Sequence, residues 1–408
     1  MIIVNLVGDL VNARTAAERL GVDVRTLYAY VSRGALRRVP GPDGRSSRYD
    51  SDELELLARR SRPRTLPRPA ASIDLVIATR VSTVADGVVR YRGTDVLDLV
   101  KAEEPFERVA DLLWQAGPPR SGGWRLTGAG ERPAVPLPGE IPLLHRFAIA
   151  VAAIAADVSV DAAVPDWPSC GRHAIGCLID ASGAESDHRD HPGHPDQAAH
   201  PDQAGHLDDD ATVARRVWRR WSPLNPTPAR VRALDIALVL LAEHELALST
   251  LSVRVAASAR ARPASCLLAG LSTLSGSLHG GAARTAHDKL AAREPLVSGF
   301  GHPVHRHGDP RVTPLLEAVY AIATDEDRSV IENARRAAPR PLNVDFALGA
   351  LTYAARMPAE AATAIFAIAR VAGWIAHAAE EYDEPPLRFR GRAVRSSRGG
   401  LRSSPSGG

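Results

Sequence analysis

The sequence predicts a mainly α-helical protein with more than one domain. Alanine and leucine dominate its apolar residues, and both favour helices over strands. Few segments after residue 73 show the alternation of apolar and polar side chains that marks strands. A chain of 408 residues is also long enough to bury two or three sizeable cores.

Two short helices are predicted at the N-terminus. Residues 15–20 form the first, a glycine ends it, and residues 24–32 form the second. Residues 41–44 predict a tight turn between two arginine-bearing arms, and a further helix is expected over residues 52–60. The apolar face of the helix pair is expected to consist of Ala16, Leu20, Val22, Leu27 and Val31.

This N-terminal region resembles the winged helix-turn-helix of MerR-like, excisionase-type DNA-binding domains. The matching strings start at Thr15-Ala-Ala-Glu, at Arg25-Thr-Leu-Tyr and at Arg48-Tyr. The resemblance implies a DNA-binding domain over residues 1–60, whose DNA contacts would be Arg25, Thr26, Tyr28, Arg45 and Arg48. Residues 1–68 also carry thirteen arginines against eight acids, a basic excess typical of nucleic-acid binding. A helical domain for protein contacts is the alternative.

Three further segments are predicted to lie outside any packed core. Residues 61–72 form a linker rich in proline and arginine, which cannot continue a helix. Residues 183–210 repeat His-Pro-Asp-Gln-Ala and predict a disordered insert. Residues 393–408, rich in glycine, serine and arginine, predict a loose tail.

The cysteines and the apolar segments indicate a cytoplasmic protein without a membrane span. Three cysteines are too few, and odd in number, for a disulfide framework. Cys170, His173 and Cys177 lack a visible fourth ligand, so no metal site is expected. No apolar segment of the sequence reaches transmembrane length, and no signal-peptide pattern precedes residue 20.

Four polar clusters interrupt the helical pattern of the second half. They are residues 243–250, 276–282, 299–311 and 343–346, and they hold histidines, arginines and one aspartate ahead of a helix. A carboxylate base with histidine donors suits removal of a proton next to a carbonyl group. Arginines suit capture of carboxylates. The clusters therefore favour an enzyme that makes or breaks a carbon–carbon bond in a polycarboxylate.

From about residue 75 to residue 392 the chain resembles the citrate synthase family. The order and spacing of the matching strings follow the family; they are Tyr91-Arg-Gly-Thr-Asp95, residues 106–117, His244-Glu-Leu, Leu278-His-Gly-Gly-Ala282, Gly299-Phe-Gly-His302, Asp309-Pro-Arg311, Asn343-Val-Asp345 and residues 366–377. The resemblance implies a helical large domain over residues 73–279 and 353–392, a small domain over residues 280–352, and a homodimer. It implies no cofactor, since acetyl-CoA is a substrate.

The resemblance also assigns roles to single residues. Asp345 matches the base that removes a methyl proton from acetyl-CoA, His279 matches the donor to the thioester oxygen, and His302 matches the residue that polarises the ketone of oxaloacetate. Oxaloacetate-binding groups match His244, Arg311, Arg370 and, from the neighbouring subunit, Arg390, while Arg306 matches a contact to coenzyme A. His305 and His307 receive no role.

The resemblance leaves the exact activity open. Citrate synthase acting on acetyl-CoA is the leading interpretation, and a 2-methylcitrate synthase acting on propionyl-CoA is close to it, because one methylene changes binding by only about 1–3 kcal/mol. The other alternative is a DNA-binding regulator that senses a metabolite through a citrate synthase fold. The intact His279, His302 and Asp345 favour the enzyme.

Overall fold

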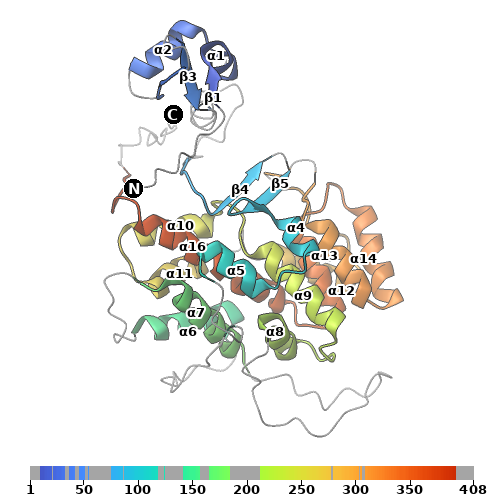
Figure 1. Ribbon diagram of the computed structural model, residues 1–408. Helices are drawn as coiled ribbons and strands as arrows, with labels where there is room; N and C mark the ends of the chain where they lie inside the picture. Colours follow the sequence, from blue (N-terminus) through green and yellow to red (C-terminus); the bar gives the residue numbers. More distant parts are fainter. Residues whose placement is uncertain are drawn as a thin grey trace, which may run out of the picture. The chain divides into compact units, whose positions relative to one another are not determined.

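The computed structural model describes most of the chain in two compact units, residues Met1–Ile77 and Ala78–Gly408 (Figure 1). The described residues are 10–20, 22–32, 36–41, 46–50, 54, 75–85, 87–117, 124, 141–156, 165–183, 212–276, 279–302, 304–305 and 308–391. The predicted linker, the insert apart from Gly183, and the tail lie outside them. So does the predicted helix over residues 52–60, apart from Leu54. The division into a large and a small domain stays a prediction.

The first unit contains the two predicted helices and a small antiparallel sheet of order β1-β3-β2. Its buried core consists of Ala16, Ala17, Leu20, Leu27, Leu36, Tyr49 and Leu54, with Val22 and Val31 partly buried against it. The expected apolar face is therefore confirmed. The elements are β1 (Leu10–Asn12), α1 (Ala13–Leu20), α2 (Val24–Ser32), β2 (Val39–Pro40) and β3 (Ser47–Asp50).

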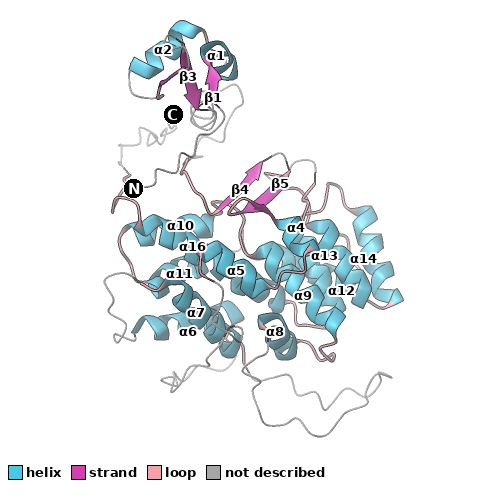
Figure 2. Ribbon diagram, viewed as in Figure 1, coloured by secondary structure: helices cyan, strands magenta, loops and turns pink. Residues whose placement is uncertain are grey.

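The second unit is mainly helical, as predicted (Figure 2). One small antiparallel sheet, of order β4-β5-β6, precedes the helices and was not expected. Its strands are β4 (Ser82–Ala85), β5 (Val88–Tyr91) and β6 (Thr94–Asp95). The described helices are α4 (Val96–Lys101), α5 (Phe106–Trp114), α6 (Leu143–Ala156), α7 (Trp167–Ala181), α8 (Val213–Trp221), α9 (Pro228–Leu241), α10 (Leu248–Ser258), α11 (Pro263–Leu274), α12 (Ala282–Ala292), α13 (Val312–Ile322), α14 (Asp325–Ala337), α15 (Val344–Ala354) and α16 (Glu360–Tyr382).

Helix α16 lies at the centre of this unit and contacts helices from both halves of it, α5, α7, α9, α10, α11 and α12 among them (Figure 1). It is long and apolar enough to span a membrane by length and composition, but 89% of its apolar window is buried inside the protein. Burial on nearly all sides is what a core helix shows. Helix α9 is similar, since every residue from Ala233 to Leu241 is buried.

A buried network of charged side chains ties α16 to the segment that follows α9. Arg254 on α10 donates to Glu381 at 2.9 Å and to Glu380 at 2.7 Å. His377 and Glu243 form a further pair, with Nε2 and Oε1 3.1 Å apart. Ser82 on β4 also donates to Glu243, at 3.2 Å. The network fixes the chain immediately before His244.

The backbone packs equally closely at this point. The Gly373 amide on α16 donates to the Ala242 carbonyl at 3.1 Å, and a Cβ at position 373 would come within 1.9 Å of Glu243 Oε2. A side chain at this position would therefore push α16 away from the segment after α9. The Tyr91 hydroxyl donates to the Glu243 carbonyl at 2.9 Å and holds the same segment from the sheet side.

Candidate active site

Four segments that are distant in sequence bring the three predicted catalytic side chains and the predicted binding residue His244 together in the second unit. His244 lies between α9 and α10, His279 precedes α12, His302 precedes α13, and Asp345 lies in the first turn of α15. The imidazole centroids of His244 and His302 are 5.0 Å apart. The charge of Arg370 on α16 affects the pKa values of His244, His279 and Asp345, so it lies close to all three.

The loop that carries His302 is paired to the segment before α15. The Gly301 amide donates to the Pro341 carbonyl at 2.7 Å, and the Asn343 amide donates to the Gly299 carbonyl at 3.0 Å. Gly299 has φ +85°, and a Cβ there would lie 3.0 Å from Phe346 Cβ, so only glycine fits. This pairing brings His302 and Asp345 into one site.

Asp345 is a half-buried carboxyl at the N-terminus of α15. The Asn343 side chain caps this helix, because its Oδ1 accepts from the Asp345 amide at 3.1 Å. Burial raises the pKa of Asp345 to about 6; the charge of Arg311 opposes the rise and that of Asp309 adds to it. Among the described residues, none donates a hydrogen bond to the Asp345 carboxyl group. A carboxylate with such a pKa suits general base catalysis near neutral pH.

His302 is held as a neutral hydrogen-bond donor. Its Nδ1 accepts from the backbone amides of Val304 at 3.2 Å and His305 at 3.3 Å. Because a backbone amide always donates, we assign the proton of the imidazole to Nε2. Burial, followed by the charge of Arg311, lowers the pKa of His302 to about 4. The Nε2–H group is therefore available at neutral pH to a carbonyl oxygen.

His279 and His244 are also kept neutral. The Nε2 atom of His279 lies 3.0 Å from the Ser249 hydroxyl, and burial followed by the charge of Arg370 lowers its pKa. His244 is buried, and its pKa is lowered first by burial and then by the charges of Arg311 and Arg370. Neutral imidazoles can donate to a developing negative charge without adding a permanent charge of their own.

His305 was expected to have no role, yet the structure places it beside two of the predicted site residues. It is only 4% exposed, and its Nε2 lies 2.9 Å from Nε2 of His244. Its ring centroid is 5.0 Å from that of His302. The rings of His302 and His305 lie close together, a contact that the composition of the loop does not reveal. His307 lies outside the described residues.

Two buried arginines provide the positive charge of the site. Arg311 donates through Nε and Nη2 to the two Asp309 oxygens, at 2.9 and 2.8 Å. Burial alone would raise the pKa of Asp309, but the charge and hydrogen bonds of Arg311 hold it below its ordinary value. Asp309 also accepts from the Val344 amide at 3.0 Å. It therefore orients Arg311 and fixes the start of α15, a role that was not predicted.

Arg370 is placed differently. Its Nε donates to the Leu241 carbonyl at 3.0 Å, and its guanidinium lies 4.6 Å from the centroid of the Phe366 ring. Only 2% of the residue is exposed. No described residue accepts from its two terminal nitrogens, which leaves them for another acceptor.

The remaining predicted residues do not join this site in the described chain. Arg390 is exposed near the end of the described residues, and Arg306 lies outside them. In the first unit, Arg25 and Tyr28 are exposed on α2, whereas the Thr26 side chain and Arg45 lie outside the described residues. Arg48 donates to the Leu10 carbonyl at 3.2 Å and so joins β1 to β3.

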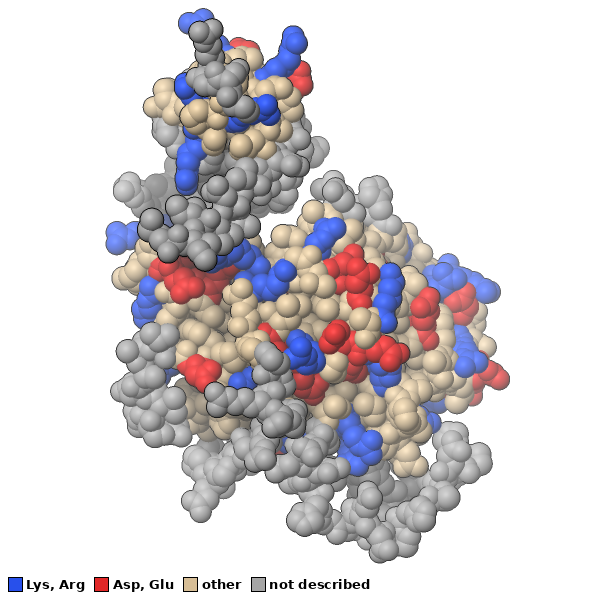
Figure 3. All heavy atoms as spheres, viewed as in Figure 1, with Lys and Arg blue, Asp and Glu red and all other residues tan. Residues whose placement is uncertain are grey.

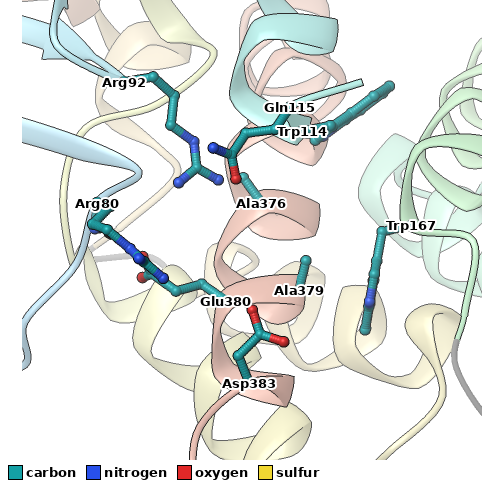
Figure 4. Close-up of a pocket in the computed structure, with 9 residues that line it drawn as sticks. All are labelled: Arg80, Arg92, Trp114, Gln115, Trp167, Ala376, Ala379, Glu380 and Asp383. Atoms are coloured by element: carbon teal, nitrogen blue, oxygen red, sulfur yellow. Dashed lines mark hydrogen bonds and ion pairs between the residues drawn. The ribbon is translucent and has the colours of Figure 1, made fainter. Parts of the chain in front are cut away.

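A separate small pocket lies beside Glu380, near the C-terminal end of α16 (Figure 4). Its volume is about 60 Å³, well below the roughly 300–1,000 Å³ of a site for a larger ligand. Figure 4 shows Arg80 and Arg92 on one side of it and Trp167 on the other. None of the predicted catalytic residues lines it.

Comparison with known proteins agrees with this arrangement. The family model for the citrate synthase C-terminal domain matches residues 186–392, about half of the chain. A candidate citrate synthase 2 from Mycobacterium tuberculosis is 28% identical over 330 residues, which cover 72% of this chain and 83% of that protein. A 2-methylcitrate synthase 2 from Corynebacterium glutamicum is 34% identical over 185 residues, 39% of this chain and 48% of that protein.

A solved structure shares the fold. Citrate synthase from Thermoplasma acidophilum, in a ternary complex with carboxymethyl coenzyme A and oxaloacetate, matches with a TM-score of 0.57 at 22% identity; the match covers 81% of this chain and 96% of that one. Neither this comparison nor the family match supports the predicted helix-turn-helix, which stays a prediction. The chain belongs to the citrate synthase family and is an acyltransferase.

Proposed function

We propose that this chain condenses acetyl-CoA with oxaloacetate and hydrolyses the citryl-CoA formed, releasing citrate and coenzyme A. The observation that carries the proposal is Asp345: a carboxyl with a pKa of about 6 and no hydrogen-bond donor among the described residues, beside neutral imidazoles and buried arginines. A group buried at such a cost to its charged form is typical of a catalytic base.

In the proposed reaction each side chain has one task. Asp345 takes a proton from the methyl group of acetyl-CoA, while His279 donates a hydrogen bond to the thioester oxygen and stabilises the enolate. The new carbon nucleophile attacks the ketone carbon of oxaloacetate, and His302 Nε2–H stabilises the oxygen that becomes negative. Water then cleaves the thioester, which yields citrate and free coenzyme A.

The substrate carboxylates are assigned to the positive groups of the site. Arg311 and Arg370 are buried and Arg311 is already oriented by Asp309, so binding oxaloacetate orders few further side chains. We assign His244 to the same substrate, and Arg306 to coenzyme A. No cofactor is required, because the acyl group is activated by its own thioester.

A 2-methylcitrate synthase is the second candidate, because one relative with that name is 34% identical over part of the chain. The two activities are separated by supplying oxaloacetate with either acetyl-CoA or propionyl-CoA. Thiol release gives the rate, and mass spectrometry of the product distinguishes citrate from 2-methylcitrate. Faster turnover of acetyl-CoA supports the first proposal. Faster turnover of propionyl-CoA supports the second, and no thiol release with either substrate rejects both.

We further propose a cytoplasmic homodimer in which Arg390 completes the site of the neighbouring subunit. The exposure of Arg390 in the single chain supports this. Mixing two inactive variants, Asp345→Asn and Arg390→Ala, tests it, because hybrid dimers would contain one site with both residues intact. Activity that returns on mixing supports the exchange, whereas two variants that stay inactive together contradict it.

DNA binding by the first unit is a separate proposal, and it includes the alternative of a metabolite-sensing regulator. Its support is the basic excess of this region and the exposure of Arg25 and Tyr28, the latter 49% exposed. Basic side chains predominate among the charged residues on the visible face of this unit (Figure 3). A gel shift with DNA upstream of the coding sequence should weaken with salt and with Arg25→Ala. A shift that is unaffected by both contradicts the proposal.

A further inference from the structure

The strongest feature that the proposed reaction leaves unused is His305. It is buried, and its Nε2 lies 2.9 Å from Nε2 of His244. Its other nitrogen, Nδ1, is buried and has no hydrogen-bond partner among the described residues. Buried polar atoms are nearly always paired, so this arrangement calls for an explanation.

The pair has only two neutral forms. A hydrogen bond between two imidazole nitrogens contains one proton, so one ring donates from Nε2 and the other accepts. If His244 donated, the proton of His305 would be on Nδ1, and a buried N–H group would have no acceptor in the described part of the chain. If His305 donates, its Nδ1 is only an unused lone pair. A buried N–H group without an acceptor is rarer in proteins than a buried acceptor without a donor. The form in which His305 donates is therefore favoured.

The form in which His305 donates also determines which nitrogen of His244 carries the proton. Because its Nε2 accepts from His305, the single proton of neutral His244 must be on Nδ1. No described residue accepts a hydrogen bond from that Nδ1. His244 is therefore left with one donor that is free to meet a bound oxygen.

A metal site explains the same cluster less well. Nitrogen atoms of His244, His302 and His305 all lie within 4.8 Å of one another, which is close enough for one ion. However, His302 Nδ1 accepts from two backbone amides, so its Nε2 carries the proton and has no lone pair for a metal. Two buried guanidinium groups, Arg311 and Arg370, add positive charge beside His244 and oppose a cation.

We propose that His305 is a positioning residue: its Nε2–H holds His244 in the Nδ1–H tautomer, so that His244 presents a donor to an oxygen of the bound oxo acid. The statement about the oxo acid rests on the function proposed above, whereas the statement about the tautomer does not. His305 thus acts on the substrate through His244.

Nitrogen-15 NMR of the full-length protein labelled at histidine tests the tautomer directly. The signals of His244 and His305 are identified by their loss in His244→Asn and His305→Leu. The expected result is a protonated Nδ1 and an accepting Nε2 on His244, a changed tautomer ratio in His305→Leu, and recovery in His305→Gln, whose amide can donate from a similar place. A proton on His244 Nε2 in the unaltered protein would overturn the proposal.

Kinetics test the consequence for the substrate. Loss of one hydrogen bond should raise the KM for oxaloacetate about two- to tenfold in His305→Leu with a smaller change in kcat, and His305→Gln should restore most of it. His287→Leu is the matched control, since His287 on α12 bonds Thr352 at 2.9 Å and does not belong to this cluster. An equal effect in the control, or no recovery in His305→Gln, would overturn the positioning role.

The two experiments separate the possible failures. If the unaltered protein releases no thiol while His244 shows the expected tautomer, the proposed function fails and the tautomer assignment stands. If turnover is normal but the proton of His244 is on Nε2, the positioning role of His305 is rejected and the proposed function stands. Micromolar binding of Zn²⁺ alone that shifts all three imidazoles would also reject the assignment.

Discussion

Two polar regions of the larger unit meet at the adjacent residues Glu243 and His244 and are built in different ways. In the buried ion network, Arg254, His377 and the carboxylates of Glu243, Glu380 and Glu381 each have an oppositely charged or hydrogen-bonding partner inside the protein. In the site, the Asp345 carboxyl has no donor, and His305 Nδ1 has no partner, among the described residues. Glu243 Oε2 and Arg254 Nη2 in the network also have no partner, but both of these groups are held through their other atoms, whereas no described residue donates to either oxygen of Asp345.

The pKa values follow the same division. In the network, burial alone would raise the pKa of Glu380, but hydrogen bonds from Arg254 and other donors reverse the effect and hold it below the ordinary value. In the site, burial prevails and raises the pKa of Asp345 to about 6. Both carboxyl groups lose hydration on burial. Hydrogen bonds offset that loss at Glu380, whereas at Asp345 the loss prevails.

The largest expected effect separates activity from stability at Asp345. Asp345→Asn removes the base, so kcat should fall about 10²–10⁴-fold. Because the half-buried carboxyl has no donor among the described residues, the Asp345→Asn protein should unfold at the same temperature or a higher one. Thiol release and thermal melting of one preparation measure both. If Asp345→Asn is inactive only because it unfolds at a lower temperature, Asp345 is needed for stability like the network residues, and the contrast between the two regions is contradicted.

Arg254→Met should give the opposite result. Removing Arg254 leaves Glu380 and Glu381 buried with fewer partners, and breaking a buried pair in this way costs about 3–5 kcal/mol. Urea unfolding measures the loss. The matched control is Arg335→Met, whose exposed pair with Glu332 should contribute about 1 kcal/mol or less. Equal losses in the two variants would mean that the network is no more important than a surface pair.

Arg370→Lys tests whether the site uses its second guanidinium for a carboxylate. A lysine keeps the charge but cannot form the paired hydrogen bonds of arginine. Loss of one charged hydrogen bond corresponds to about 1.5–3 kcal/mol, so the KM for oxaloacetate should rise about 10- to 150-fold. Steady-state kinetics with oxaloacetate varied measure this. An unchanged KM would assign Arg370 to structure alone.

The pH dependence should also divide the two regions. Asp345 must be ionised to accept a proton, so kcat/KM should fall as the pH drops through about 6, approaching tenfold per unit below it. Glu380 has a lowered pKa in the folded protein, so its stabilising contribution is complete above the ordinary pKa of a glutamate and is lost progressively as the pH falls from there through the lowered value. Activity should therefore be lost at a pH where thermal stability remains. Loss of both in parallel would contradict this order.

Much of the site could be predicted from the sequence, because glycine, proline, histidine and arginine clusters stand out against apolar helices. The helices at residues 13–20 and 24–32 were also predictable from their apolar spacing and the glycine between them. The sheet β4-β5-β6 was not, because its strands are only two to four residues long and alternation needs a longer segment.

The contacts of His305 and Asp309 could not be predicted for a different reason. Each depends on a contact across the fold or within an irregular loop: His305 meets His244 from 61 residues away, and Asp309 accepts from Val344. The partners in the buried network, such as Arg254 and Glu381, are likewise separated by 127 residues. A composition pattern identifies which groups are unusual, but only the fold shows which of them are paired.

The most direct test of the account follows the hydrogen atoms of the methyl group. Acetyl-CoA with a fully deuterated methyl group is supplied with oxaloacetate in ordinary water, and the citrate is analysed by mass spectrometry. If Asp345 is the base, the citrate should have lost one methyl deuterium and kept two, and Asp345→Asn should form almost no citrate at an unchanged melting temperature. Citrate formed by Asp345→Asn at a rate close to that of the unaltered protein would contradict it.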